Sequence, residues 1–136
     1  MKNTKGFTLI ELAMVITIIG LLSAIILGTI QINRDRGANA SIKQNLNSLR
    51  SEVELLYSNS LSTYVGVCDI TKVLQIRSVI NQASGGTSVC YSNTVTWAAS
   101  APLKTPEGSN NYWCVDTRGT ARGHATALPV NSTVCP

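Results

Sequence analysis

The longest apolar stretch of the chain lies near its amino terminus and has no charged residue between Leu12 and Ile32. About 20 such residues are what an α-helix needs to cross the ~30 Å hydrocarbon core of a bilayer. Lys2 and Lys5 precede this stretch, so we expect the amino end on the cytoplasmic side and the remainder outside. The pattern therefore predicts one membrane-spanning helix near the amino terminus.

Beyond this stretch, apolar residues recur at alternating spacings of four and three, the stripe of an amphipathic helix. They are Ile42, Leu46, Leu49, Val53 and Leu56. A helix running unbroken from Phe7 to about Tyr57 would be roughly 75 Å long. Its outer half can bury the stripe against a globular head. Its inner half must contact lipid or other copies of the chain, which favours a polymer.

A second, shorter helix is predicted where four apolar residues share one face. They are Ile70, Val73, Leu74 and Ile80. Asp69 or Thr71 can cap the start of this helix, and Gly85-Gly86 is expected to end it. The head therefore contributes a helix of its own beside the long one.

After this helix the pattern changes to strands. Residues 94–98 and 112–116 are rich in β-prone residues, and a loop rich in Pro, Ser, Gly and Asn separates them. Thr117-Arg118-Gly119 predicts a hairpin turn, and a final short strand is expected at Val134 and Cys135. We therefore expect an α+β fold, in which a small antiparallel sheet packs on the outer half of the long helix.

All four cysteines lie beyond the apolar stretch, in a head small enough to need covalent cross-links. This placement indicates two disulfides formed in an oxidising compartment. Three pairings are possible. We favour Cys68 with Cys90 and Cys114 with Cys135, because each closes a loop of about twenty residues, worth roughly 3 kcal/mol.

Catalytic chemistry is not indicated by the sequence. It contains no G-x-S-x-G elbow, no phosphate-binding glycine motif and no C-x-x-C pair. His124 has no acid close in sequence and is expected at the surface. We therefore expect no catalytic residue, no metal and no cofactor.

The junction in front of the apolar stretch is unusual. A secretory signal has its small-residue cleavage site after the apolar core, whereas here the small residue, Gly6, precedes it. A cut at Gly6 would leave the apolar segment on the mature protein, as an anchor or an assembly element. Glu11 is the second unusual feature, because a carboxylate near the membrane is costly and usually marks a function or a partner. A simple single-span anchor does not explain Glu11.

The segment Gly6-Phe7-Thr8-Leu9-Ile10-Glu11-Leu12 resembles the prepilin signature of bacterial type IV pilins and of the pseudopilins of type II secretion. The resemblance implies that a membrane peptidase cuts between Gly6 and Phe7 and then methylates the amino group of Phe7. It also implies that Glu11 is the acid used in filament assembly. The expected segments are a cleaved leader at 1–6, a transmembrane and assembly helix at 7–32, its amphipathic continuation at 33–58, and an extracytoplasmic head at 59–136.

Three partners for Glu11 follow from its position. The first turn of its own helix offers unpaired amide groups and the positive end of the dipole. The amino group of Phe7 in the same mature chain lies one turn back. The third partner is the amino terminus of a neighbouring subunit, which would set the axial register of a filament. The resemblance favours this intermolecular contact.

The leading hypothesis is a structural subunit of a type IV pilus, assembled as a helical homopolymer through its amino-terminal helix and supporting adhesion, twitching motility or DNA uptake. One alternative is a pseudopilin of a periplasmic pseudopilus, although only Asp116 offers a calcium-ligating acid near the end of the head. The other is an anchored binding protein. The chain is expected in the bacterial inner membrane before assembly, and then in a filament on the cell surface or in the periplasm.

The implied partners are other copies of the chain, the prepilin peptidase, the inner-membrane assembly machinery and the membrane itself. The formal net charge is +4 at pH 7, and Arg118 and Arg122 flank the predicted turn, with Lys104 in the preceding loop. Repeated along a fibre, these charges would form a stripe that attracts phosphate, so DNA or surfaces are further hypothetical partners. The alternative is that these charges only keep the head soluble.

Overall fold

The computed structural model describes residues 6–136, so Lys2 and Lys5 of the expected leader lie outside the described residues. The chain divides into two compact units, one ending at Arg34 and one beginning at Asp35. The elements are α1 (Leu9–Leu56), a π-helical turn η1 (Tyr57–Leu61), a 3-10 turn η2 (Val67–Asp69), α2 (Thr71–Ser84), β1 (Val89–Ser92), β2 (Trp97–Glu107), β3 (Asn110–Asp116) and β4 (Ala121–His124).

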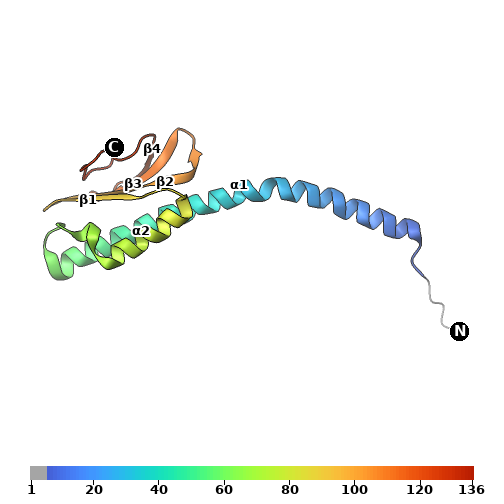
Figure 1. Cartoon of the computed structure of the whole chain (residues 1–136), viewed down its shortest axis with the longest axis horizontal. Helices are drawn as coiled ribbons and strands as arrows, with labels where there is room; N and C mark the ends of the chain where they lie inside the picture. The colour runs from blue at the N-terminus through green and yellow to red at the C-terminus, as the bar shows by residue number, and fades with distance from the viewer. Residues whose placement is uncertain (1–5) are drawn as a thin grey trace. The chain divides into compact units, whose positions relative to one another are not determined.

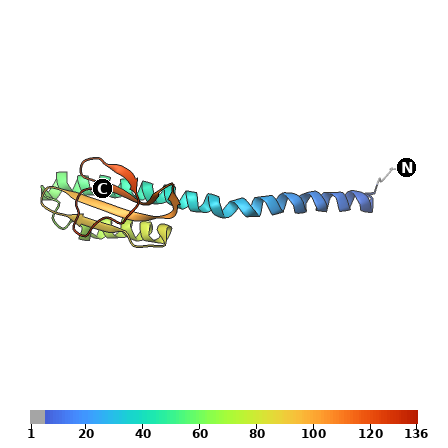
Figure 2. The same cartoon turned by 90° about the horizontal axis from the view of Figure 1, so that it is seen from above.

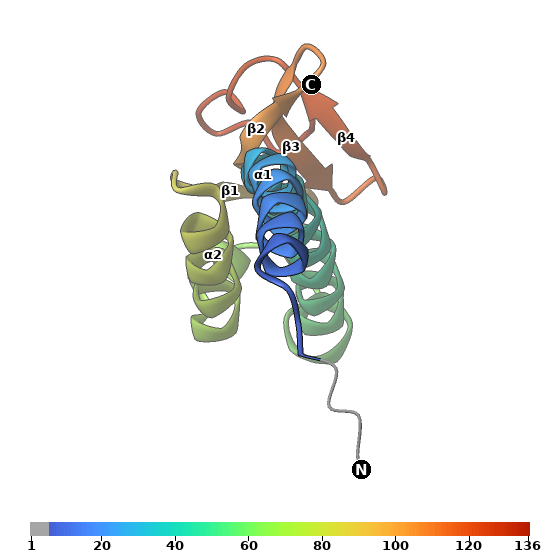
Figure 3. The same ribbon diagram turned by 90° about the vertical axis from the view of Figure 1, so that its right-hand side faces the viewer.

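In the unit that begins at Asp35, two helices cover one face of a sheet. The four strands are antiparallel and follow the order β1-β2-β3-β4. The outer part of α1 and the whole of α2 lie side by side on the same face (Figures 1 and 3). Seen from above, the segment that follows β4 passes over the opposite face (Figure 2). The predicted α+β fold, with a long apolar helix and an antiparallel sheet, is confirmed.

The main core lies between the helices and the sheet. The predicted apolar stripe of α1 supplies its first layer, with Ile42, Leu46, Leu49 and Val53 fully buried. Trp97, Ala99, Ala101 and Leu103 of β2 face these residues, and Val73 and Ile80 of α2 complete the layer. Because side chains alternate along a strand, the residues between them face the other way. The small alanines leave room for α1 against β2.

A second, smaller core lies on the other face of the sheet. Ala98 and Cys114 are buried there beneath Leu128 and Cys135 of the carboxyl-terminal segment. Two disulfides stabilise the head, Cys68–Cys90 and Cys114–Cys135, the pairs favoured from loop length. The second disulfide joins β3 to the carboxyl-terminal segment, so it holds this segment on the sheet.

The strands differ from the prediction in three places. β2 continues through the region expected to be a loop, although it contains Pro102. β1 pairs with β2 only as far as Ser100, so Pro102 lies where β2 has a free edge and a missing N–H is tolerated. The short strand β1 was not predicted. The expected strand at Val134 and Cys135 is wrong, because the described chain has no strand after β4.

The ends of α2 follow the prediction in part. Gly85 ends the helix in the left-handed conformation, with φ 72°, and its N–H donates to the Asn81 carbonyl oxygen. The N-cap position is occupied by Ile70, which provides no side-chain cap, so the expected capping by Asp69 or Thr71 is wrong. Packing of Val73 and Ile80 against the core therefore stabilises α2 without a polar cap.

Candidate functional site

The first turn of α1 is closed by a reciprocal pair of polar side chains, Thr8 and Glu11. The backbone N–H and the hydroxyl of Thr8 both donate to Oε2 of Glu11, at 2.9 Å and 2.8 Å. In return, the N–H of Glu11 donates to Oγ1 of Thr8 at 3.3 Å. This arrangement is a capping box, which satisfies helix amide groups that have no partner within the helix.

Of the three partners considered for Glu11, the structure therefore shows the first, which is the first turn of its own helix. Thr8 is the residue that the sequence analysis missed, although the spacing T-x-x-E at the start of an apolar run is itself a sequence signal for a capping box. In the described chain, both hydrogen bonds accepted by the Glu11 side chain end on Oε2. Oε1 accepts none there, so it remains available to a donor from another chain.

Gly6 and Phe7 lie before α1 and outside regular structure, and both are exposed. A Cβ placed on Gly6 would meet no atom within 4 Å. The peptide bond between these residues therefore lies on exposed, irregular backbone, which is the kind of segment that peptidases cleave most readily. The structure places this bond two residues ahead of the helix that carries Glu11.

Residues of α1 up to Ile32 expose their apolar side chains. The exposed fraction is 88% for Leu9, 69% for Ile25 and 71% for Leu27. By length and composition, this is the one helix of the described chain that could cross a membrane. Contiguous apolar surface of this extent marks a contact with lipid or with protein.

The polar residues within the apolar stretch bond to their own helix. The hydroxyls of Thr17, Ser23 and Thr29 donate to carbonyl oxygens three or four residues back, at 2.7 Å, 2.8 Å and 3.0 Å. A hydroxyl with a partner in its own helix carries no unsatisfied group into an apolar environment. These three residues therefore leave the surface of α1 compatible with lipid or with other apolar helices.

The groups considered for other chemistry lie in the head. His124 is buried and not at the surface as expected, and its Nε2 lies 3.1 Å from Oγ of Ser100. Burial lowers the pKa of His124, the backbone of Thr126 opposes this shift, and the charge of Arg122 adds to it. Ser100 is 1% exposed, so this Ser–His pair is closed to a substrate. Within residues 6–136, no group of three or more His, Cys, Asp or Glu side chains could hold a metal ion.

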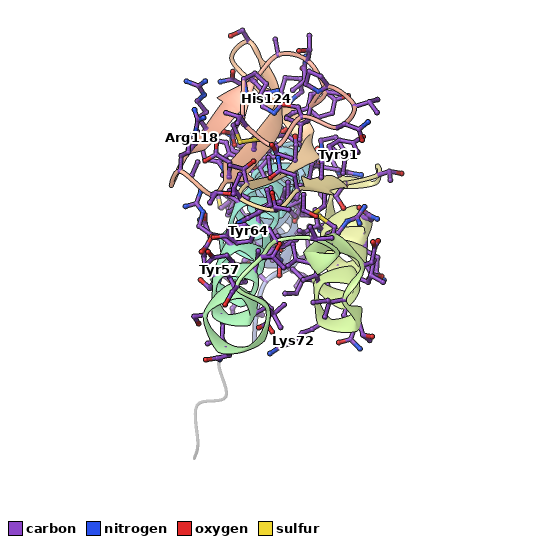
Figure 4. All side chains as sticks on the ribbon, turned by 90° about the vertical axis from the view of Figure 1, so that its left-hand side faces the viewer. Tyr57, Tyr64, Lys72, Tyr91, Arg118 and His124 are labelled. Carbon is purple, nitrogen blue, oxygen red and sulfur yellow. A yellow bond between two sulfur atoms is a disulfide. The ribbon has the colours of Figure 1, made fainter. Side chains whose placement is uncertain are left out.

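The basic residues singled out in the sequence lie at the surface of the head. Lys104, Arg118 and Arg122 are all exposed. Figure 4 shows Arg118 on the opposite side of the head from Tyr91. Trp97 is fully buried and donates its indole N–H to Glu54 at 3.0 Å, so it is a residue of the core.

Comparison with protein-family models places the amino-terminal segment in a known family of motifs. Residues 1–27 match the family model described as the prokaryotic N-terminal methylation motif. The match includes the Gly6–Phe7 junction, the Thr8–Glu11 capping box and most of the apolar stretch, and it ends before the head. No solved structure matches the chain.

Proposed function

This chain carries the prepilin signature of type IV pilins and pseudopilins at residues 1–27, and we propose that it is the structural subunit of a type IV pilus. In this proposal the prepilin peptidase removes residues 1–6 and methylates the amino group of Phe7. The subunit then waits in the inner membrane, anchored by α1. The inner-membrane assembly machinery moves it into a helical homopolymer on the cell surface. The proposal includes no catalytic role.

The observation that carries the proposal is a carboxylate with a free oxygen at the start of an exposed apolar helix. Oε2 of Glu11 is held by Thr8, and Oε1 is open. An amino group of a neighbouring subunit could bind Oε1 while the capping box stays closed. The attraction between opposite charges is stronger among apolar helices than in water, and this gain offsets the cost of removing the two groups from water.

The exposed apolar surface of α1 supports the same assembly. In the membrane, lipid covers it; in a filament, the same segments of other subunits would replace the lipid. Each subunit would offer its apolar helix and accept another, in the head-to-tail manner that produces open helical polymers. The contact between Glu11 and a neighbouring amino group would then select one axial position among many similar apolar contacts.

The proposal is tested first by the mass and amino-terminal sequence of the mature chain from its own cells. A chain that begins at Phe7 and is heavier by one methyl group supports processing as a prepilin. A chain that begins at Met1, or one cut beyond Ile32, contradicts it.

The second test is imaging of cells with antibodies against the head. Labelled surface fibres are expected for the wild type and for Gln82→Ala, a variant at an exposed position of α2, and no fibres are expected for Glu11→Ala. The Glu11→Ala protein should still be processed and should accumulate in the inner membrane. If the wild-type chain is correctly processed but no surface fibre is labelled, the pilus assignment is contradicted. A periplasmic pseudopilus is then the assembly that remains.

A further inference from the structure

A cavity of about 400 Å³ opens on the head beside the Cys68–Cys90 disulfide. It lies where η2, the end of β1 and the carboxyl-terminal segment meet. Its walls include Asp69 from η2, Tyr91 from β1, and Asn131 and Thr133 from the carboxyl-terminal segment. Its size falls within the range of small-molecule sites.

The walls of this cavity are held in place by bonds within the head. The disulfide fixes η2 against β1. On the opposite wall, Thr133 accepts a hydrogen bond from the Asn93 amide at 3.2 Å, and its Oγ1 lies 2.7 Å from that of Thr96. A ligand entering the cavity would therefore not need to order these segments, a cost that weakens binding to mobile sites.

Two polar side chains of the cavity, both exposed to solvent, have no partner within the protein and are free to bind a ligand in place of water. In the part of the chain that the structure describes, no side-chain hydrogen bond or ion pair engages the Asp69 carboxylate or the Asn131 amide. Asn131 has a φ of 62°, a left-handed conformation that few residues other than glycine and asparagine adopt readily. Tyr91, which Figure 4 labels, is partly buried, packs against the smaller core and is one of the residues that line the cavity.

The charged and hydrogen-bonding groups of the cavity walls indicate which class of ligand would fit. They carry one carboxylate and no cationic side chain, so an anionic ligand would be repelled. Asp69 can only accept hydrogen bonds, whereas Asn131 and the hydroxyl groups can both donate and accept. A ligand with several adjacent hydroxyl groups matches this set, and a ring of apolar C–H groups could rest against Tyr91. We propose that this cavity binds a saccharide, with Asp69 as the main acceptor of its hydroxyl groups.

The proposal can be tested by saturation-transfer difference NMR on the full chain in phosphocholine micelles, since glucoside and maltoside detergents would compete. The probes are glucose, galactose, N-acetylglucosamine, N-acetylgalactosamine and lactose. At least one is expected to bind the wild type. Asp69→Asn should weaken binding about tenfold or more, because a hydrogen bond to a charged acceptor is lost. Asn131→Gly, which keeps the left-handed backbone, should also weaken it, and Gln82→Ala on the exposed face of α2 should not.

Two results would overturn the proposal. One is that none of the five sugars binds. This includes the case in which the organic cation spermidine, tested as a further probe, binds instead. The other is sugar binding that neither Asp69→Asn nor Asn131→Gly changes while circular dichroism shows both variants to be folded. If Asp69→Asn does not fold, Asn131→Gly alone decides. The measurement uses unassembled protein, so its outcome is independent of filament formation.

Discussion

The carboxylate of Glu54 in α1 accepts hydrogen bonds from two aromatic side chains of the head. Replacing Glu54 therefore tests how much this acceptor stabilises the core. Its Oε1 accepts the indole N–H of Trp97 at 3.0 Å and its Oε2 accepts the hydroxyl of Tyr64 at 2.8 Å. Trp97 is fully buried, and Tyr64 is 5% exposed and stacks on Tyr57 with ring centroids 4.4 Å apart. Burial, together with the hydrogen bond to Glu54, raises the pKa of Tyr64 to about 12. Both donors therefore depend on one carboxylate.

Glu54→Ala would leave the buried indole N–H without a partner. An unsatisfied buried donor costs about 1–3 kcal/mol, and loss of the charged acceptor of Tyr64 adds to this cost. We expect the free energy of unfolding to fall by about 3 kcal/mol in total. Glu54→Gln keeps an acceptor for Trp97 and should lose about 1 kcal/mol.

The assay is chemical denaturation in detergent, followed by tryptophan fluorescence and by circular dichroism. Glu52→Ala is the matched control, because Glu52 lies two positions away on the same helix and pairs with Lys72 at 2.9 Å. The Glu52 side chain is 14% exposed, but its partner Lys72 is 64% exposed and stays solvated once Glu52 is gone, so loss of this ion pair should cost less than about 1 kcal/mol. If Glu52→Ala and Glu54→Ala lowered the free energy of unfolding equally, the reasoning would be refuted. The cost of each substitution would then not depend on whether the group that loses its partner is buried or exposed to water.

Four further changes have defined outcomes. Thr8→Val removes the hydroxyl that caps the N–H of Glu11, so amide exchange in the first turn of α1 should quicken roughly fivefold, as measured by NMR in micelles. Because burial lowers the pKa of His124, the free energy of unfolding should be constant above about pH 6.5 and should fall as the pH drops below that value. His124→Gln should remove this pH dependence from the denaturation curves. A Cys114→Ser, Cys135→Ser double variant should lose about 3 kcal/mol of stability and become sensitive to proteases after β4. Asn39→Ala should lower the free energy of unfolding by about 2–3 kcal/mol, because buried backbone groups of β2 lose their partner.

Local patterns of the sequence predicted much of the fold. The stripe of α1, the extent of α2 and the hairpin turn with Gly119, whose φ is 83°, all depend on neighbouring residues, and the structure has each of them. The amino-terminal signature was recognisable for the same reason. Composition predicted two disulfides in the head, because a domain this small needs covalent cross-links.

The features that could not be predicted depend on contacts between distant residues. β2 was expected to end early because prolines usually break strands, but its edge is free beyond Ser100. His124 was expected at the surface, yet it is buried, with Ser100 of β2 and the stacked ring of Tyr112 of β3 beside it. The cavity next to Asp69 exists only because the carboxyl-terminal segment returns to β1. No local pattern reports these long-range arrangements.

The position of α1 on the sheet is set by its polar residues more than by its apolar stripe. A stripe that repeats every three or four residues would still make apolar contacts after a shift of one turn, about 5.4 Å. Asn39 is the first buried residue of α1; its Oδ1 accepts the N–H of Lys104 at 2.7 Å and its amide donates to the Thr105 carbonyl oxygen at 2.8 Å.

At the other end of the stripe, Glu54 accepts the indole N–H of Trp97. From Asn39 to Glu54 the helix rises about 22 Å, and from Trp97 to Lys104 an extended strand covers about 23 Å. The two polar contacts therefore fit the helix and the strand at one position only, with the two elements antiparallel. A shift by one turn would break both contacts and leave the buried groups unpaired, so these two residues fix the position of β2 along the part of α1 that belongs to the head.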